Sequence, residues 1–257
     1  MQTDTRSHPR TRGLPSARTR TGFTLVELLV VMMIIAMLAS MISFAMFRSM
    51  QAAREAKTQS LISKLHNVVS RQWDTYVTRQ VAEGTPEEQL AAIRELIQWE
   101  MPDAAGDLVD APASLINQNI TGTVNGASGY VDAQCLYQLV LQIADDDLDR
   151  INFFSDDEVK DLDGNGSPDV FIDGWGEPIS FIRRPTGFPA TLSDLNDPDS
   201  PDPFDLTDSP ANGVYFPLIF SGGPDKANGL TASSGTPNAG NAHLDNIHNH
   251  RIDARLR

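Results

Sequence analysis

The fold of this chain follows from the stretch GFTLVELLV at residues 22–30, which opens an apolar run that continues to Phe47. Between Leu28 and Phe47 only Ser40 and Ser43 are polar, and the run contains neither glycine nor proline. An apolar run of about 20 residues is long enough to span the hydrocarbon core of a bilayer as a helix. The sequence therefore predicts one membrane-spanning helix near the amino terminus.

One acidic residue, Glu27, lies at the edge of this apolar run. An ionisable side chain is costly to bury in a bilayer, so it marks a functional site whose partner is expected to be a cation. An ordinary single-pass anchor explains the length of the run but neither this acid nor the Gly22-Phe23 pair. A secretory signal peptide would have a shorter apolar core of about 7–15 residues, followed by a small-residue cleavage site.

A basic leader, Gly22 directly before Phe23, and TLVE at residues 24–27 together resemble the amino-terminal signal of type IV pilins and type II secretion pseudopilins. The resemblance implies that a prepilin peptidase cuts after Gly22 on the cytoplasmic side and methylates the new amino terminus at Phe23. It also implies that Glu27, the fifth mature residue, pairs with the terminal ammonium of a neighbouring subunit in a filament.

The motif divides the chain into three predicted parts. Residues 1–22 are a leader, residues 23–47 are the transmembrane half of the first helix, and residues 48–257 form an extracytoplasmic pilin-like domain that includes the amphipathic half of that helix. A chain of 257 residues, less a leader and a membrane span, is long enough for one domain of ordinary size.

Charge is distributed unevenly along the chain. The formal net charge is −14, but the leader has five arginines against one aspartate, a net charge of +4, so residues 23–257 carry −18. A strongly acidic domain is not expected to bind nucleic acid. The basic leader favours a cytoplasmic amino terminus, although Arg48, Arg54 and Lys57 follow the span closely and weaken that argument. The family resemblance implies a single-pass protein of the inner membrane with its C-terminal domain outside the cytoplasm.

After Phe47 the pattern becomes amphipathic, with apolar residues recurring at spacings of three and four up to Val77. The helix is therefore expected to run from about Thr24 to about Arg79. Its apolar stripe is too short and irregular for a free coiled coil, and it predicts a C-terminal domain packed on the helix, as in the pilin fold.

Further elements are expected along the rest of the chain. Thr85, Pro86 and Glu88 form a helix-start signal, and Pro102 stops that helix. The other expected elements are a loop at 103–130, a helix at 133–143, strands at 179–182 and 214–220, an acidic loop at 193–210 too polar to join the core, and a mobile segment at 226–242. The predicted fold class is α+β and pilin-like: a long transmembrane-to-amphipathic helix packed against a small antiparallel sheet, with extra short helices and long loops.

Two later segments also resemble pseudopilins. DGWGEP at residues 173–178 and SGGPD at residues 221–225 are similar to the Asp-Pro-Trp-Gly-x-Pro and Ser-x-Gly-x-Asp-Gly segments of the major, G-type pseudopilins. Gly174 stands where the family usually has proline, and the insertion between the two segments is long. Trp175 is expected to be a core plug that locks the edge of the sheet.

An acidic loop at residues 161–173 predicts calcium binding. Oxygen-bearing residues recur there at the spacing of an EF-hand loop. They are Asp161, Asp163, Asn165, Ser167 and Asp169. Position twelve of an EF-hand loop is usually a glutamate that binds calcium through both oxygens, but here it is Ile172. The last calcium ligand is therefore expected to be Asp173, Asp157 or Glu158. The alternative is a solvated acidic turn, which clustered carboxylates disfavour because they repel each other unless a cation neutralises them.

No catalytic constellation is present in the sequence, and the chain is not expected to be an enzyme. Cys135 is the only cysteine, so it cannot form an intramolecular disulfide and is expected to be a buried small hydrophobe. The histidine-containing tail offers His243, Asp245, His248 and His250, which could ligate zinc but are expected to be solvated.

The expected function is structural: a subunit of a type II secretion pseudopilus or a type IV pilus-like filament. The expected partners are copies of the chain or paralogous pseudopilins, a prepilin peptidase, the inner-membrane assembly platform and the membrane itself. A membrane-anchored calcium-dependent adhesion or binding protein is the alternative. An anchored hydrolase is a third reading that depends on the histidine-containing tail alone.

Overall fold

The computed structural model describes residues 22–81, 84–108, 130–145, 153–162, 164–200, 202, 204, 213–240 and 242–251. The chain divides into two compact units, Met1–Arg48 and Ser49–Arg257. Apart from Gly22, the predicted leader lies outside the described residues.

The first helix, α1, comprises Leu25–Thr78 and agrees with the helix predicted from about Thr24 to about Arg79. In the first unit all of residues 22–48 are exposed, although most of them are apolar. So large an apolar surface requires lipid or a partner. By length and composition α1 can cross a membrane.

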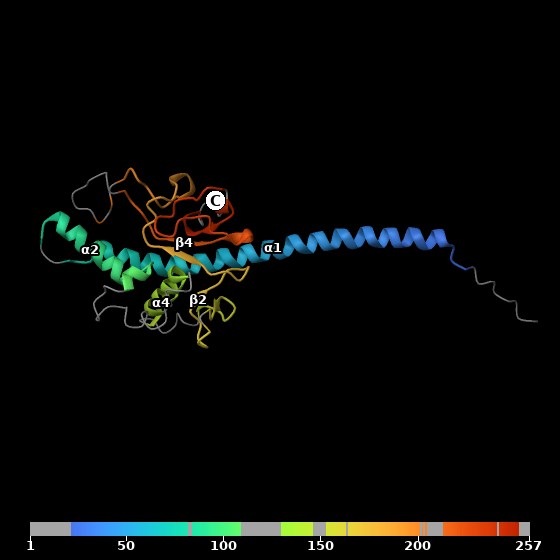
Figure 1. Cartoon of the computed structure of the whole chain (residues 1–257), viewed down its shortest axis with the longest axis horizontal. Coiled ribbons are helices and arrows are strands. Elements are labelled where there is room, and N and C mark those ends of the chain that lie inside the picture. The colour runs from blue at the N-terminus through green and yellow to red at the C-terminus, as the bar shows by residue number, and fades with distance from the viewer. Residues whose placement is uncertain are drawn as a thin grey trace, which may run out of the picture. The chain divides into compact units, whose positions relative to one another are not determined.

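The part of α1 in the second unit carries the predicted apolar stripe. Leu61, Leu65, Val69 and Tyr76 are fully buried, at the spacing of one helix face. In Figure 1 this half of α1 passes between α4 and β2 on one side and β4 on the other. The main core gathers around the stripe and includes residues from each of these elements. The prediction that a domain packs on the helix is therefore confirmed.

In the described part of the chain, two further α-helices cover this core. Helix α2, Pro86–Glu100, begins at Thr85, whose side chain and that of Glu88 form the predicted capping box, and it stops before Pro102. A short 3₁₀ turn, Ala105–Leu108, follows. Helix α4, Val131–Asp145, is slightly longer than predicted, and residues 109–129 of the predicted loop lie outside the described residues.

The described residues of the second unit also form two small antiparallel sheets. Strands β1, Val159–Lys160, and β2, Val170–Phe171, form a two-stranded sheet. The other sheet has the order β3-β4-β5, with β3 at Ser180–Ile182, β4 at Leu218–Ser221 and β5 at Ile247–His248. All residues of the central strand β4 are buried. This arrangement of a long helix, short helices and small sheets confirms the α+β, pilin-like fold class.

Two of the sequence predictions about the sheet and tail are wrong. The strand expected at 214–220 begins only at Leu218, because Val214 instead forms an isolated bridge with Asp197. The histidine-containing segment is not fully solvated in its described part: β5 pairs with β4, and Asn249 and His250 are buried. The tail packs here because the side-chain oxygen of Asn249 accepts a hydrogen bond from the Ile219 N–H at 2.9 Å.

The loops also contribute more to the core than their polarity predicts. In the acidic loop, Phe204 is buried, and its ring centroid lies 5.1 Å from that of Trp73. Leu230, in the segment expected to be mobile, is buried in a second apolar cluster with Ile182 and Phe220. Single apolar residues in polar segments carry no periodic pattern, so sequence reasoning missed them.

Candidate functional site

The first turn of α1 is closed by a reciprocal cap between Thr24 and Glu27. Oε2 of Glu27 accepts hydrogen bonds from the Thr24 backbone N–H at 3.0 Å and the Thr24 hydroxyl at 3.1 Å. The Glu27 N–H donates to Oγ1 of Thr24 at 3.2 Å. This is the geometry of a capping box, which satisfies donors that a helix start leaves open. The Thr-x-x-Glu spacing signals such a box, but sequence reasoning considered only the charge of Glu27.

The cap uses one oxygen of the carboxylate. Among the described residues Oε1 of Glu27 accepts no hydrogen bond, so it can still meet a cation, and the whole side chain is exposed. The adjoining Gly22 and Phe23 are exposed and precede the helix. The peptide bond that the motif marks for cleavage is thus outside regular secondary structure and next to a preformed helix start.

In the second unit, the segment at residues 173–178 forms a tight turn around the buried carboxylate of Asp173. Oδ1 of Asp173 accepts hydrogen bonds from the N–H groups of Trp175 at 2.8 Å and Glu177 at 2.9 Å. Oδ2 accepts the hydroxyl of Ser221 at 2.6 Å. Ser221 in turn accepts the N–H of Gly223 at 3.0 Å. The two segments that resemble pseudopilins therefore meet at a single carboxylate.

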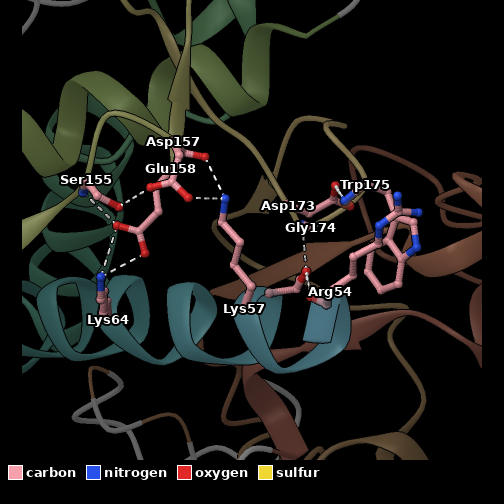
Figure 2. A network of polar contacts seen from close by, with 10 residues as sticks. Arg54, Lys57, Lys64, Ser155, Asp157, Glu158, Asp173, Gly174 and Trp175 are labelled. Atoms are coloured by element: carbon pink, nitrogen blue, oxygen red, sulfur yellow. Dashed lines mark hydrogen bonds and ion pairs between the residues drawn. The ribbon is translucent and has the colours of Figure 1, made fainter. Parts of the chain in front are cut away.

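The same turn rests on the backbone of α1 (Figure 2). The N–H of Gly174 donates to the Thr58 hydroxyl at 2.9 Å, and that hydroxyl donates to the Arg54 carbonyl at 2.9 Å. A Cβ built on Gly174 would lie 2.5 Å from the Arg54 carbonyl oxygen, closer than atoms can approach. A proline here would have both a Cβ and no N–H to donate. The close approach to α1 thus explains why glycine replaces the proline of the family pattern.

Trp175 is positioned differently from the expectation. It is half-buried against the main core, and its ring N–H donates to Oε1 of Gln51 at 3.0 Å. It therefore fastens the turn to α1 instead of plugging the sheet edge. A buried indole usually satisfies its N–H in this way, but the partner cannot be identified from spacing alone.

Two lysines of α1 hold the acidic residues that precede β1. Nζ of Lys57 lies 2.6 Å from Oδ2 of Asp157, and Nζ of Lys64 lies 2.8 Å from Oε1 of Glu158 (Figure 2). Burial alone would raise the pKa of Glu158, but the hydrogen bonds from Lys64 and from the Ser155 N–H lower it below its usual range. Two of the three candidates for the last calcium ligand, Asp157 and Glu158, are thus engaged with α1. The lysines are seven residues apart and share one helix face, which is the signal that sequence reasoning missed.

The predicted calcium loop is closed by its own hydrogen bonds. The Asp161 carboxylate accepts the N–H groups of Gly164 and Gly166, each at 2.7 Å, and the Asn165 side chain accepts the N–H of Ser167 at 2.8 Å. Gly166 adopts a φ of 92°, a left-handed backbone conformation that glycine adopts readily. This is the geometry of the alternative reading, an acidic turn stabilised by local side-chain acceptors.

The remaining predicted ligands are placed in other networks. Asp169 is buried and accepts the Leu162 N–H at 2.8 Å and the Gln134 side-chain amide at 2.7 Å. Asp173 belongs to the turn with Ser221, and Asp163 lies outside the described residues. Among the residues that the structure describes, no group of three or more His, Cys, Asp or Glu could hold a metal. Calcium binding remains a prediction.

The histidine-containing tail is part of the second unit's packing. Nδ1 of His250 lies 2.8 Å from the Ser193 hydroxyl, and Nε2 lies 3.2 Å from the Pro217 carbonyl. The carbonyl can only accept, so Nε2 carries the proton and Nδ1 accepts from Ser193. Burial lowers the pKa of His250 to about 3, which keeps the ring neutral. His250 is therefore a core residue and is not available as a solvated metal ligand.

A comparison with known families identifies the amino-terminal part of the chain. Residues 17–43 match the family described as the prokaryotic N-terminal methylation motif. This is the prepilin signal of type IV pilins and pseudopilins, a class of structural subunits. The chain accordingly carries the signal of a pilin-like precursor that is processed by prepilin peptidase and anchored in a membrane by one helix. Neither the comparison with curated proteins nor that with solved structures gave a match.

Proposed function

We propose that the chain is a structural subunit of a type II secretion pseudopilus or a type IV pilus-like filament. The observation that carries the proposal is the prepilin signal at residues 17–43, coinciding with an exposed apolar helix whose first turn presents Glu27. The apolar surface of residues 23–47 can contact lipid before assembly and the helices of neighbouring subunits after assembly.

Glu27 has the role of an assembly residue in this proposal. Cleavage after Gly22 creates a new ammonium at Phe23. In the filament Oε1 of Glu27, which the Thr24 cap leaves open, receives the Phe23 ammonium of a neighbouring subunit. In an apolar surrounding such a pair is strong, whereas an unpaired charge is costly.

A type II secretion pseudopilus is the kind of filament that we favour. Support comes from the contact between the segments at 173–178 and 221–225, because both resemble the major pseudopilins and they meet at Asp173 and Ser221. The protein then resides in the inner membrane with its C-terminal domain outside the cytoplasm. Its partners are copies of itself or paralogous pseudopilins, the prepilin peptidase and the inner-membrane assembly platform.

The experiment is crosslinking of neighbouring subunits in cells that contain prepilin peptidase. Cysteines introduced at exposed positions of α1, such as Ile42 and Met50, should form disulfide-linked ladders only when the leader is removed. The native Cys135 is fully buried, so it is not accessible for crosslinking in the folded protein. A processed protein that remains monomeric and binds surface glycan in a calcium-dependent manner would instead favour the anchored adhesion protein.

A further inference from the structure

A cavity of about 210 Å³ lies in the second unit, beside α1 and α2 and away from the turn that rests on Thr58. The lining residues that matter here are two arginines, one aspartate and three aromatic residues. They are Arg94, Arg184, Asp202, Trp73, Phe204 and Tyr215.

The charges in this cavity are not balanced. Nη2 of Arg94 lies 3.1 Å from Oδ2 of Asp202, while Oδ1 of Asp202 is taken by the Phe204 N–H at 3.0 Å. Nε of Arg94 is buried and has no hydrogen-bond partner among the described residues. Among the described lining residues, the carboxylate of Asp202 thus pairs with Arg94 alone, although the Arg184 guanidinium also lines the cavity.

Arg184 is the cation without a counter-ion. Its guanidinium makes no hydrogen bond or ion pair with any residue in the described part of the chain, and it lies 5.5 Å from the centroid of the Tyr215 ring. Burial lowers the pKa of Arg184, the nearby Arg94 lowers it further, and Asp202 opposes both. The neighbouring Arg183 differs, since it lies 2.8 Å from Asp107 and 3.5 Å from Asp103.

Aromatic rings form part of the cavity wall. Trp73 and Phe204 meet edge to face, with ring centroids 5.1 Å apart, and Tyr215 stacks against Arg184. Aromatic walls of this kind suit a planar ligand body. A guanidinium fork matches the two oxygens of a carboxylate.

We propose that this cavity binds a small carboxylic acid with a flat apolar body, whose carboxylate bridges Nε of Arg94 and the Arg184 guanidinium while its body lies against Trp73 and Phe204. The volume is below the roughly 300–1,000 Å³ of most ligand pockets, so it suits an aryl acid better than a nucleotide. The proposal is independent of filament assembly, because it concerns a folded subunit.

The test is calorimetric titration of the detergent-solubilised full chain with phenylacetate, and with phenylacetamide as the uncharged analogue. We expect saturable phenylacetate binding that weakens as salt is raised, and at least tenfold weaker binding of phenylacetamide. Arg184→Gln should weaken phenylacetate binding at least tenfold, and Arg184→Lys, which keeps the charge but loses the fork, should weaken it less. Arg71→Gln removes an exposed arginine outside the cavity and should have no effect.

Three results would overturn the proposal. They are the absence of saturable phenylacetate binding, equal binding of phenylacetamide, and undiminished binding by Arg184→Gln. Unchanged near-ultraviolet circular dichroism of Arg184→Gln shows that a loss of binding does not come from unfolding.

Discussion

The Ser221 hydroxyl and Oδ2 of Asp173 lie 2.6 Å apart in a buried contact that joins positions 48 residues apart in the chain. Asp173 shapes the turn that follows it, and Ser221 ends β4, so this bond connects the turn to the sheet. Gly174, in the same turn, is bonded to Thr58 of α1. The long helix, the turn and the sheet of the second unit are therefore linked through two consecutive residues.

Replacing Gly174 should destabilise the second unit. In Gly174→Ala the new Cβ would lie 2.5 Å from the Arg54 carbonyl oxygen, so the turn must move away from α1 and its bond to Thr58 must lengthen. We expect a loss on the order of 1–3 kcal/mol in the free energy of unfolding, as for other overpacked sites. Urea unfolding of the full chain in detergent measures this. The matched control is Gly106→Ala, where an added Cβ meets nothing within 4 Å; equal effects of the two changes would contradict the prediction.

Blocking the cleavage site should keep the leader on the chain. Gly22→Leu places a bulky side chain beside the bond that prepilin peptidase is expected to cut, and a narrow cleft admits only a small residue there. In wild-type protein, amino-terminal sequencing should give a mature chain that begins at Phe23. A mature chain that begins elsewhere, or a wild-type leader that survives active peptidase, would rule out this site.

Removing the charge of Glu27 should impair assembly without unfolding the second unit. Glu27→Gln can still accept the hydrogen bonds from Thr24, so it preserves the cap while it removes the charge. Glu27→Ala removes both, and both variants should lower the filament yield at equal expression. The control is Glu55→Gln, which changes an exposed glutamate farther along α1. Wild-type yield from Glu27→Gln would mean that the charge has no part in assembly.

The partly buried Asp103 and the buried His250 should give opposite pH dependences of stability. Burial raises the pKa of Asp103 to about 6, whereas the pKa of an aspartate in an unfolded chain is about 3.9. The carboxyl group therefore stabilises the fold below about pH 4, and this stabilisation is lost as the pH rises to about 6. Burial lowers the pKa of His250 to about 3, below the value of about 6.5 in an unfolded chain. The neutral ring therefore stabilises the fold above about pH 6.5, and this stabilisation is lost as the pH falls.

Between about pH 4 and 6 these two contributions oppose each other. Asp103→Asn should therefore make the free energy of unfolding rise with pH more steeply than in wild type, by up to about 1.4 kcal/mol per pH unit. His250→Gln should change the slope in the opposite direction. Urea unfolding across this range tests both variants, and parallel curves for wild type and Asp103→Asn would show that Asp103 titrates normally.

Calcium should stabilise the second unit if residues 161–173 bind it. For a weak site with a dissociation constant of about 10⁻⁴–10⁻³ M, calcium at about 10 mM raises the free energy of unfolding by roughly 1.4–2.7 kcal/mol. Thermal unfolding in calcium and in chelator should then give different midpoints, and Asp161→Ala/Asp163→Ala should abolish the difference. Asp74→Ala, an exposed position on α1, is the control. If the midpoint does not change, or if the shift persists in the double variant, the residues form only a polar turn.

The elements that could be predicted from sequence are those encoded by local signals. The start of α2 follows from Thr85 and Pro86, and the buried face of α1 follows from its spacing. The strand β5 could not be predicted, because two residues carry no periodicity and pair only once β4 is in place. The burial of Asn249 likewise could not be predicted, because it depends on a hydrogen bond from the Ile219 N–H that the sequence does not show.

At the candidate site, the sequence indicates which residues are important but not which residues they contact. The cleavage motif and the charge of Glu27 are visible in the sequence, but the bond to Thr24 was overlooked although its spacing signals it. The role of Gly174 depends on a helix backbone more than a hundred residues away in the chain, which no local pattern specifies. Sequence reasoning therefore located these positions more reliably than it assigned what they do.

In the filament that we propose, the reciprocal cap at the start of α1 also lowers the entropy cost of assembly. A free helix end frays, and ordering each backbone residue costs about 1–2 kcal/mol of conformational entropy. Because Thr24 and Glu27 already fix the first turn, that ordering takes place when the helix forms and not when subunits meet. The incoming subunit then presents a rigid carboxylate at a defined position, so more of the contact energy remains to hold neighbours together.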